Sequence, residues 1–227
     1  MGYAARRPAL DAEAFLAWEA GQALRHELVD GEVYAMAGAE ERHVTVGMNI
    51  GFALRQALAG TPCRTFLTDM KLRPLGADDF FYPDVFVTCA EADRALAQFK
   101  REPALIVEVL SPTTAAYDRG EKFARYRRMA SVREVVFIDI DTRRIDVHRR
   151  GPDGLFVLHA FEPGEDVVLA SVGVTLAAAV LFAEVPEAPP STGGWTGPVP
   201  EVRMPPGYWA PTPAADLPGG KGASGRG

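Results

Sequence analysis

Two acidic residues lie inside short apolar segments that are otherwise typical of buried strands. Asp84 belongs to residues 80–88 and Glu108 to residues 104–112, and both segments are rich in β-branched and aromatic or aliphatic side chains. An ionised carboxylate in a buried strand costs free energy unless it is hydrogen-bonded, ion-paired or bound to a metal. The pair therefore predicts a site for a divalent cation.

A lysine follows the second acid on a different predicted element. Lys122 lies near the start of a predicted helix, residues 118–129, which Asp118 would cap. Mg²⁺ prefers oxygen ligands, and it can polarise a phosphate and lower the pKa of a water. A nearby lysine can orient that water or stabilise charge on phosphoryl oxygens. Asp84, Glu108 and Lys122 thus match the requirements of metal-assisted phosphodiester hydrolysis.

The same three residues also fit purely structural roles. Asp84 follows Pro83 and could cap a turn, and Lys122 could pair with Asp118 on the surface of its helix. Spacing does not decide between these alternatives, because paired acids occur in many unrelated sites.

Glu27 and His43 are further candidates for the same site. His43 lies at the N-terminus of a predicted helix, where it could contact a phosphate or position a general base. The alternative is a partly buried histidine whose ring is satisfied by backbone groups. Glu27 lies in a predicted strand and could be an additional metal ligand or an acid at a strand edge.

The charge distribution bears on the substrate. The chain has a net charge of −6, yet residues 94–150 contain 13 Lys and Arg against 8 Asp and Glu. A local basic face can bind a polyanion even when the whole protein is acidic. Arg119 and Arg125 flank Lys122 in this segment and are predicted to contact nucleic-acid phosphates. A solvated helix face is the alternative for such residues.

Helices and strands that alternate along the chain would have to position these side chains. Helices are predicted at residues 11–20, 40–59 and 118–129. An Asp30-Gly31 turn predicts a hairpin between two strands, residues 24–29 and 32–36. Further strands are predicted at 65–73, 82–88, 105–110, 135–140, 144–149 and 155–159, and residues 167–182 are expected to be partly strand and partly short helix.

Composition bounds the class of protein. The chain has 227 residues, 48% of them hydrophobic, and no apolar run approaches the roughly 20 residues of a membrane helix. We expect no membrane association, a cytoplasmic location, and two buried free thiols at Cys63 and Cys89. We predict one domain over residues 1–185. The Pro- and Gly-rich composition of residues 186–227 predicts an irregular or disordered tail.

Five motifs in order resemble the Uma2 family of bacterial proteins, across residues 10–185. The first is Arg-His-Glu-Leu-Val-Asp-Gly-Glu-Val, and it is followed by His43 and by Tyr-Pro-Asp-Val around Asp84. Val-Glu-Val-Leu-Ser-Pro-Thr-Thr then contains Glu108, and Tyr-Asp-Arg-Gly-Glu-Lys-Phe contains Lys122, with Tyr126 after it. No counterpart is recognised for the segment after residue 186.

The resemblance implies an α/β (α+β) fold of the restriction-endonuclease-like type: a mixed β-sheet flanked by helices, with an added β-hairpin. On the pattern of the PD-(D/E)xK nuclease superfamily, Asp84 and Glu108 would bind the metal, and Glu27 would match an additional acid. The pattern has a lysine two positions after the glutamate, where this chain has Leu110. Lys122 would supply the lysine from the following helix instead.

We therefore expect an endonuclease that depends on Mg²⁺ or Mn²⁺, acts on DNA or another nucleic acid, and forms a homodimer. Two alternatives remain open at this point. One is a non-catalytic module that binds nucleic acid or protein on a nuclease-like fold. The other is a metal-dependent hydrolase of a small phosphorylated substrate, which would need a deep closed pocket.

Overall fold

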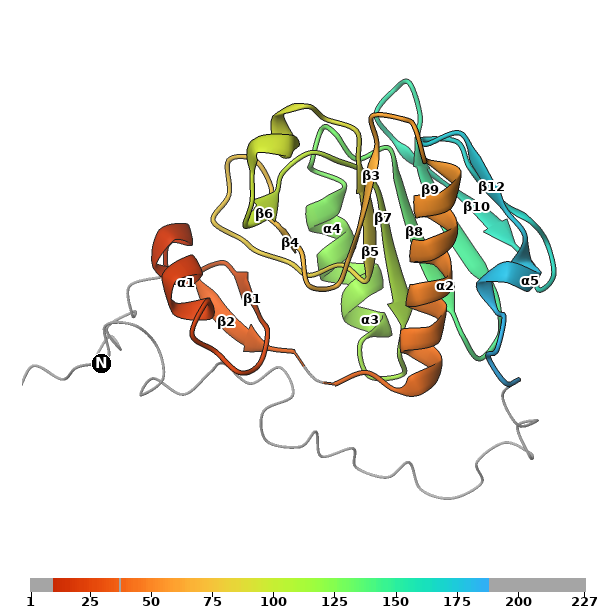
Figure 1. Ribbon diagram of the computed structural model, residues 1–227, viewed down its shortest axis with the longest axis horizontal. Helices are drawn as coiled ribbons and strands as arrows, with labels where there is room; N and C mark the ends of the chain where they lie inside the picture. The colour runs from red at the N-terminus through yellow and green to blue at the C-terminus, as the bar shows by residue number, and fades with distance from the viewer. Residues whose placement is uncertain (1–9, 37, 188–227) are drawn as a thin grey trace, which may run out of the picture. The chain divides into compact units, whose positions relative to one another are not determined.

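The computed structural model describes residues 10–36 and 38–187, which divide into two compact units (Figure 1). Among the described residues, the smaller unit contains 10–36, 38 and 76–81, and the larger contains 39–75 and 82–187. The tail predicted from residue 186 lies outside the described residues except for its first two positions. Among the described segments, none of the helices has the length and apolar character that crossing a membrane would need.

The smaller unit is built on the predicted hairpin. It contains α1 (Ala12–Glu19), β1 (His26–Val29) and β2 (Glu32–Ala35). Asp30 and Gly31 join the two strands with φ angles of 51° and 80°, which is the left-handed geometry of a tight hairpin turn. Leu28 exchanges backbone hydrogen bonds with Phe80, and this contact ties the segment 76–81 to the hairpin.

A six-stranded mixed sheet forms the centre of the larger unit, in the order β10-β9-β8-β7-β5-β3. Within the described residues of this sheet, the β7–β8 pair is parallel and the other neighbouring strands are antiparallel. The strands are β3 (Arg64–Leu67), β5 (Val85–Thr88), β7 (Pro103–Leu110), β8 (Glu134–Asp139), β9 (Ile145–Arg150) and β10 (Phe156–Phe161). Beside them lie η1 (Ala92–Ala95) and two short pairs, β4 (Lys71–Leu72) with β6 (Phe99–Lys100) and β11 (Val167–Leu169) with β12 (Val174–Leu176).

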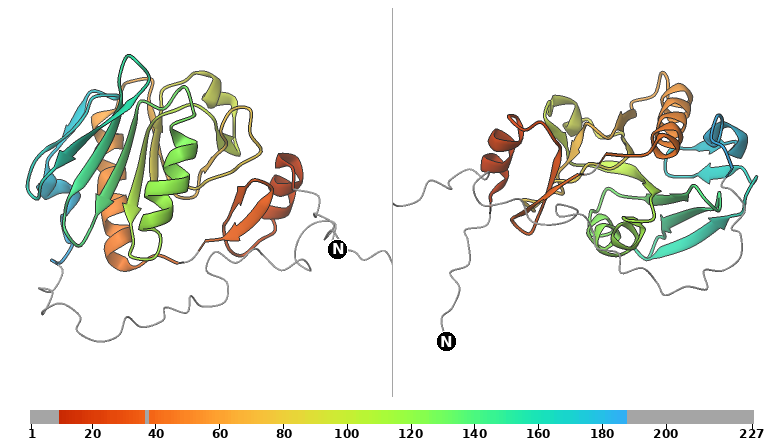
Figure 2. Two further views of the ribbon diagram at one scale, coloured as in Figure 1. Left: turned by 180° about the vertical axis from the view of Figure 1, so that it is seen from behind. Right: turned by 90° about the horizontal axis from the view of Figure 1, so that it is seen from below.

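Helices cover both faces of this sheet (Figures 1 and 2). On one face, α2 (Glu41–Ala57) packs Val46, Ile50 and Leu54 into the core that includes Val85 and Val107. On the other face lies a continuous helical segment, made of α3 (Ala115–Tyr117), the π-helical turn η2 (Asp118–Lys122) and α4 (Phe123–Tyr126). The short α5 (Ala178–Leu181) follows β12. The expected mixed sheet flanked by helices is confirmed.

Several predicted elements have different bounds, and two of these differences have a local cause. The strand predicted at 65–73 is interrupted after Leu67 by a turn, in which the Met70 amide donates to the Leu67 carbonyl. The turn-forming Thr68 and Asp69 account for the break. The helical segment begins at Ala115, not at 118, because Ser111 accepts the Thr114 amide and starts the first turn.

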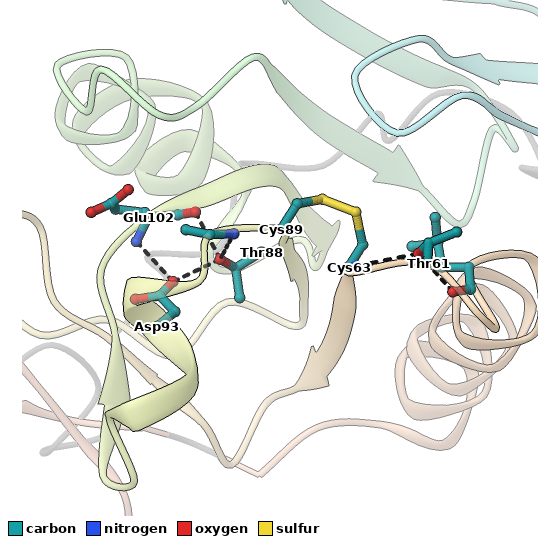
Figure 3. The surroundings of a disulfide bond; sticks show 8 residues. Thr61, Cys63, Thr88, Cys89, Asp93 and Glu102 are labelled. Atoms are coloured by element: carbon teal, nitrogen blue, oxygen red, sulfur yellow. Dashed lines mark hydrogen bonds between the residues drawn. A yellow bond between two sulfur atoms is a disulfide. The ribbon is translucent and has the colours of Figure 1, made fainter.

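The prediction of two free thiols is wrong. Cys63 and Cys89 form a disulfide, with 3.9 Å between their Cα atoms (Figure 3). Cys63 directly precedes Arg64 of β3 and Cys89 directly follows Thr88 of β5, and Arg64 and Thr88 are paired in these antiparallel strands. Cysteine count alone could not reveal the pair, because it depends on the register of these strands.

Candidate functional site

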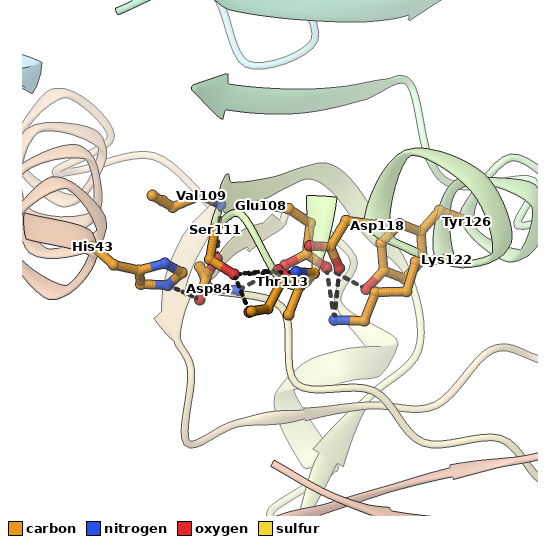
Figure 4. A network of polar contacts seen from close by, with 10 residues as sticks. His43, Asp84, Glu108, Val109, Ser111, Thr113, Asp118, Lys122 and Tyr126 are labelled. Carbon is orange, nitrogen blue, oxygen red and sulfur yellow. Dashed lines mark hydrogen bonds and ion pairs between the residues drawn. The ribbon is translucent and has the colours of Figure 1, made fainter. Parts of the chain in front are cut away.

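Strand register brings the two carboxylates together. Val85 of β5 lies opposite Val107 of β7, and continuing this antiparallel register by one residue sets Asp84 opposite Glu108. The Asp84 amide is 3.5 Å from Glu108 Oε2, and the Val109 amide donates to Asp84 Oδ2 at 2.7 Å (Figure 4). Both acids therefore lie side by side, and it is the register of the two strands that makes them neighbours.

The helical segment on the same face supplies a lysine and a tyrosine to Glu108. Lys122 Nζ lies 3.3 Å from Glu108 Oε1 and 3.6 Å from Asp118 Oδ1. The Tyr126 hydroxyl donates to Glu108 Oε1 at 2.6 Å. Asp118, Lys122 and Tyr126 recur at four-residue spacing, and the π-helical turn η2 contains the first two. Such turns occur frequently at functional sites.

His43 approaches the site from the opposite layer. It lies in the first turn of α2, and its Nε2 is 2.9 Å from Asp84 Oδ1. Burial lowers the pKa of His43, but the hydrogen bond and negative charge of Asp84 outweigh it, so the net shift is upward. Asp84, which directly precedes β5, is therefore held by a histidine from one helix layer and by the backbone of β7.

Burial shapes the electrostatics of the acids. Burial raises the pKa of Glu108 to about 8; the charges of Asp118 and Asp84 raise it as well, while Lys122 and the Tyr126 hydrogen bond oppose the shift. Burial also raises the pKa of Asp118, against the effect of Lys122. A carboxyl with a pKa near 8 holds its proton at neutral pH, and a bound cation would favour the ionised form.

The donor set fits a hard cation that takes few protein ligands. Among the described residues, no group of three or more His, Cys, Asp and Glu is arranged to hold a metal ion. Asp84 and Glu108 would supply two carboxylates and leave the other positions to water and substrate. Mg²⁺ is commonly bound in this way, through one or two carboxylates and phosphate oxygens.

Four of the predicted site residues meet in the larger unit: Asp84, Glu108, Lys122 and His43. Glu27 is buried in β1 of the smaller unit, so its role as an additional acid stays a prediction. Leu110, at the position where the superfamily pattern has lysine, is a buried residue of β7. The structure adds Asp118 and Tyr126, which four-residue spacing from Lys122 could have indicated.

The two predicted phosphate-contacting arginines differ in their surroundings. Arg119 Nη1 lies 2.6 Å from Asp146 Oδ2, and its guanidinium stands over the Phe137 ring. Phe137 is the strand neighbour of both Glu108 and Asp146, so Arg119 lies over the same face of the sheet as the acids. Arg125 is half-buried three residues after Lys122, on the same side of the helical segment.

A mixed sheet flanked by helices, with two acids on adjacent strands and a lysine from a helix beside them, defines a restriction-endonuclease-like protein. The chain belongs to the Uma2 family: the family's sequence model, described as "Putative restriction endonuclease", matches residues 12–180. It is therefore a nuclease-like protein by family and by fold.

The chain is also similar to two proteins of Synechocystis and shares its fold with a solved structure. The chain is 33% identical over 175 residues to the uncharacterized protein slr1290 of Synechocystis, covering 77% of this chain and 92% of that protein. It is 29% identical over 152 residues to sll1609 of the same organism, covering 66% and 85%. The crystal structure of "a putative nuclease belonging to DUF820" from Anabaena variabilis superposes with a TM-score of 0.63 at 17% identity, covering 76% of this chain and 97% of that one.

Proposed function

We propose that this protein is an endonuclease that uses Mg²⁺ or Mn²⁺ to hydrolyse phosphodiester bonds in DNA. The observation that carries the proposal is the grouping of Asp84, Glu108 and Lys122, with Lys122 Nζ 3.3 Å from Glu108 Oε1. A protein that only binds nucleic acid has no need to hold two acids and a lysine in contact at a cost in burial free energy. The family description supports the same chemistry.

In this proposal Asp84 and Glu108 hold the cation, which when bound would polarise a phosphate oxygen and acidify a water. His43 fixes the orientation of Asp84 through Oδ1, and the Val109 amide fixes Oδ2. Tyr126 orients Glu108 in the same manner through its hydroxyl. Partners of this kind keep metal-binding carboxylates in place and tune their basicity.

Lys122 has a different task, because its ammonium group carries the positive charge of the site. It lies within ion-pairing distance of both Glu108 and Asp118. Beside a phosphate it would stabilise the negative charge that develops on the phosphoryl oxygens, or orient the attacking water. It therefore takes the role that a lysine at position 110 would have.

Cleavage assays on DNA test the proposal. Supercoiled plasmid and single-stranded DNA are incubated with Mg²⁺ or Mn²⁺ and with wild type, Glu108→Ala or Glu121→Ala, and circular dichroism verifies folding. Glu121 is an exposed acid of the same turn, so its variant should cleave like wild type, whereas Glu108→Ala should be inactive.

Two outcomes would contradict the proposal. Equal cleavage by wild type and Glu108→Ala would mean that the activity belongs to a contaminant. A wild-type protein that binds DNA but neither cleaves it nor binds Mg²⁺ or Mn²⁺ in calorimetry would favour the non-catalytic binding module.

A further inference from the structure

The outer face of α2 carries apolar side chains where a surface helix normally carries polar ones. Val44, Met48 and Phe52 are 54%, 56% and 67% exposed. At about 100° per residue, Val44 and Phe52 lie within about 40° of Met48 on the helix surface. The buried residues Val46 and Ile50 lie on the opposite side. The helix is therefore apolar on two faces, and only one of them packs against the sheet.

The exposed apolar surface continues onto the neighbouring edge strand. Leu67 of β3 packs over Gly51, where a Cβ would overlap with its side chain, yet Leu67 is 47% exposed. β3 is the last strand of the sheet on this side. Contiguous apolar patches on the order of a few hundred Å² commonly mark interaction sites. We call Val44, Met48, Phe52 and Leu67 the α2 patch.

Charged residues extend the stripe symmetrically about Met48. Val44 and Phe52 are four residues from Met48 on either side, and Glu41 and Arg55 are seven residues from it. Glu41 and Arg55 are exposed, and neither forms an ion pair within the part of the chain that the structure describes. The order along the helix face is thus acid, apolar, apolar, apolar, base.

We propose that the α2 patch binds a second copy of this chain, with the two α2 helices antiparallel and a two-fold axis at Met48. Val44 then faces Phe52 of the partner subunit, which pairs a small side chain with a large one. Glu41 faces Arg55 of the partner subunit at both ends. Such an interface is self-complementary, as two-fold symmetry requires. A parallel arrangement would instead bring like charges together.

The expected dimer is reversible. The distance from Glu41 to Arg55 along the helix is about 21 Å at about 1.5 Å per residue, which is short for an interface. A standard stable interface takes about 20 to 30 residues from each partner, whereas the α2 patch consists of Val44, Met48, Phe52 and Leu67. Association should therefore depend on protein concentration. It does not rest on the proposed cleavage activity, so either inference can fail without the other.

A charge-exchange cycle tests the antiparallel pairing. Sedimentation velocity of the full chain over a wide concentration range should give a reversible dimer. Glu41→Arg and Arg55→Glu each create two repulsive pairs, and each should weaken the dimer about tenfold or more. The double variant restores opposite charges and should recover most of the wild-type affinity. Met48→Lys, which brings two ammonium groups to the axis, should give monomers.

A cross-link tests the position of the axis. Met48→Cys brings two thiols together across the axis, and mild oxidation should link the protomers, while Gln56→Cys on the flank of α2 should not be linked. A wild-type chain that stays monomeric at every concentration would overturn the proposal. A dimer that withstands Met48→Lys, or a double charge exchange that fails to restore affinity, would overturn it as well.

Discussion

At Glu108, burial raises the pKa of the carboxyl to about 8, whereas an ordinary glutamate titrates near 4.5. As the pH rises between these two values, the Glu108 carboxyl loses its proton in the unfolded chain but keeps it in the folded chain. The free energy of unfolding of the metal-free protein therefore falls as the pH rises from about 4.5 to about 8, and this part of the stability is lost above pH 8.

Glu108→Gln should remove this fall in stability with rising pH, because glutamine does not ionise. In the presence of a chelator, the variant should melt at a higher temperature than wild type above pH 8, and the difference should shrink as the pH falls toward 4.5. Thermal unfolding monitored by circular dichroism measures this difference in melting temperature, with Glu121→Gln at an exposed position as the control. Parallel pH profiles for wild type and Glu108→Gln would show that burial does not penalise the charged carboxylate.

The His43–Asp84 contact makes a separate prediction about metal affinity. His43→Ala frees Asp84 Oδ1 from its 2.9 Å partner, so the carboxylate loses part of its fixed orientation. We expect Mg²⁺ binding to weaken by about tenfold or more, since loss of such orienting partners typically costs that much. Calorimetric titration measures the change. His159→Ala, at an exposed position of β10, should bind like wild type, and equal affinities for all three proteins would refute the orienting role.

Among the elements, those with strong local signals could be predicted from the sequence. The Asp30-Gly31 turn determines the hairpin, and the β-branched, aromatic and aliphatic residues around Asp84 and Glu108 predict the strands β5 and β7. Lys122 is predicted from its place on the helix that follows the second acid, and the family resemblance matches it to the lysine absent at position 110. These features depend on residues close together in the chain or on a period of two, which a sequence displays directly.

Features that depend on contacts between distant segments could not be predicted. The predicted start of the helical segment at Asp118 is too late, because Ser111, and not Asp118, caps its first turn. Asp118 instead turns inward beside Lys122. The disulfide depends on the register of β3 against β5, which the sequence does not specify.

The disulfide between Cys63 and Cys89 should contribute to the free energy of unfolding. Cys63 and Cys89 are 26 residues apart, so the bond restricts a medium-sized loop of the unfolded chain. By the loop-entropy relation, replacing both with serine should lower the free energy of unfolding by about 3.5 kcal/mol. Urea denaturation measures this, and a reductant should destabilise wild type but not the double variant. Identical midpoints with and without the bond would refute the prediction.

Across the whole molecule, charge is distributed unevenly. The net charge of −6 would repel DNA, but residues 94–150 carry more basic than acidic residues and include Glu108 and Lys122. Some of these arginines hold the fold together. Arg150 donates to backbone carbonyls of Arg127, Met129 and Val132, and Arg149 donates to Glu134. Only part of the basic excess is therefore available to phosphates, and a single arginine beside the site should matter more than the total.

Arg125 is the arginine to test, because it lies three residues after Lys122 on the same side of the helical segment. In the Glu108→Ala background, which prevents cleavage, Arg125→Ala should weaken duplex binding. It should also reduce the slope of log affinity against log salt concentration by about one, as expected for one lost phosphate contact. Fluorescence anisotropy measures both. Arg94→Ala removes an exposed charge of the same basic segment on η1 and should leave the slope unchanged. If both variants reduce this slope equally, DNA binding depends on the net charge of the basic segment and not on a phosphate contact beside the site.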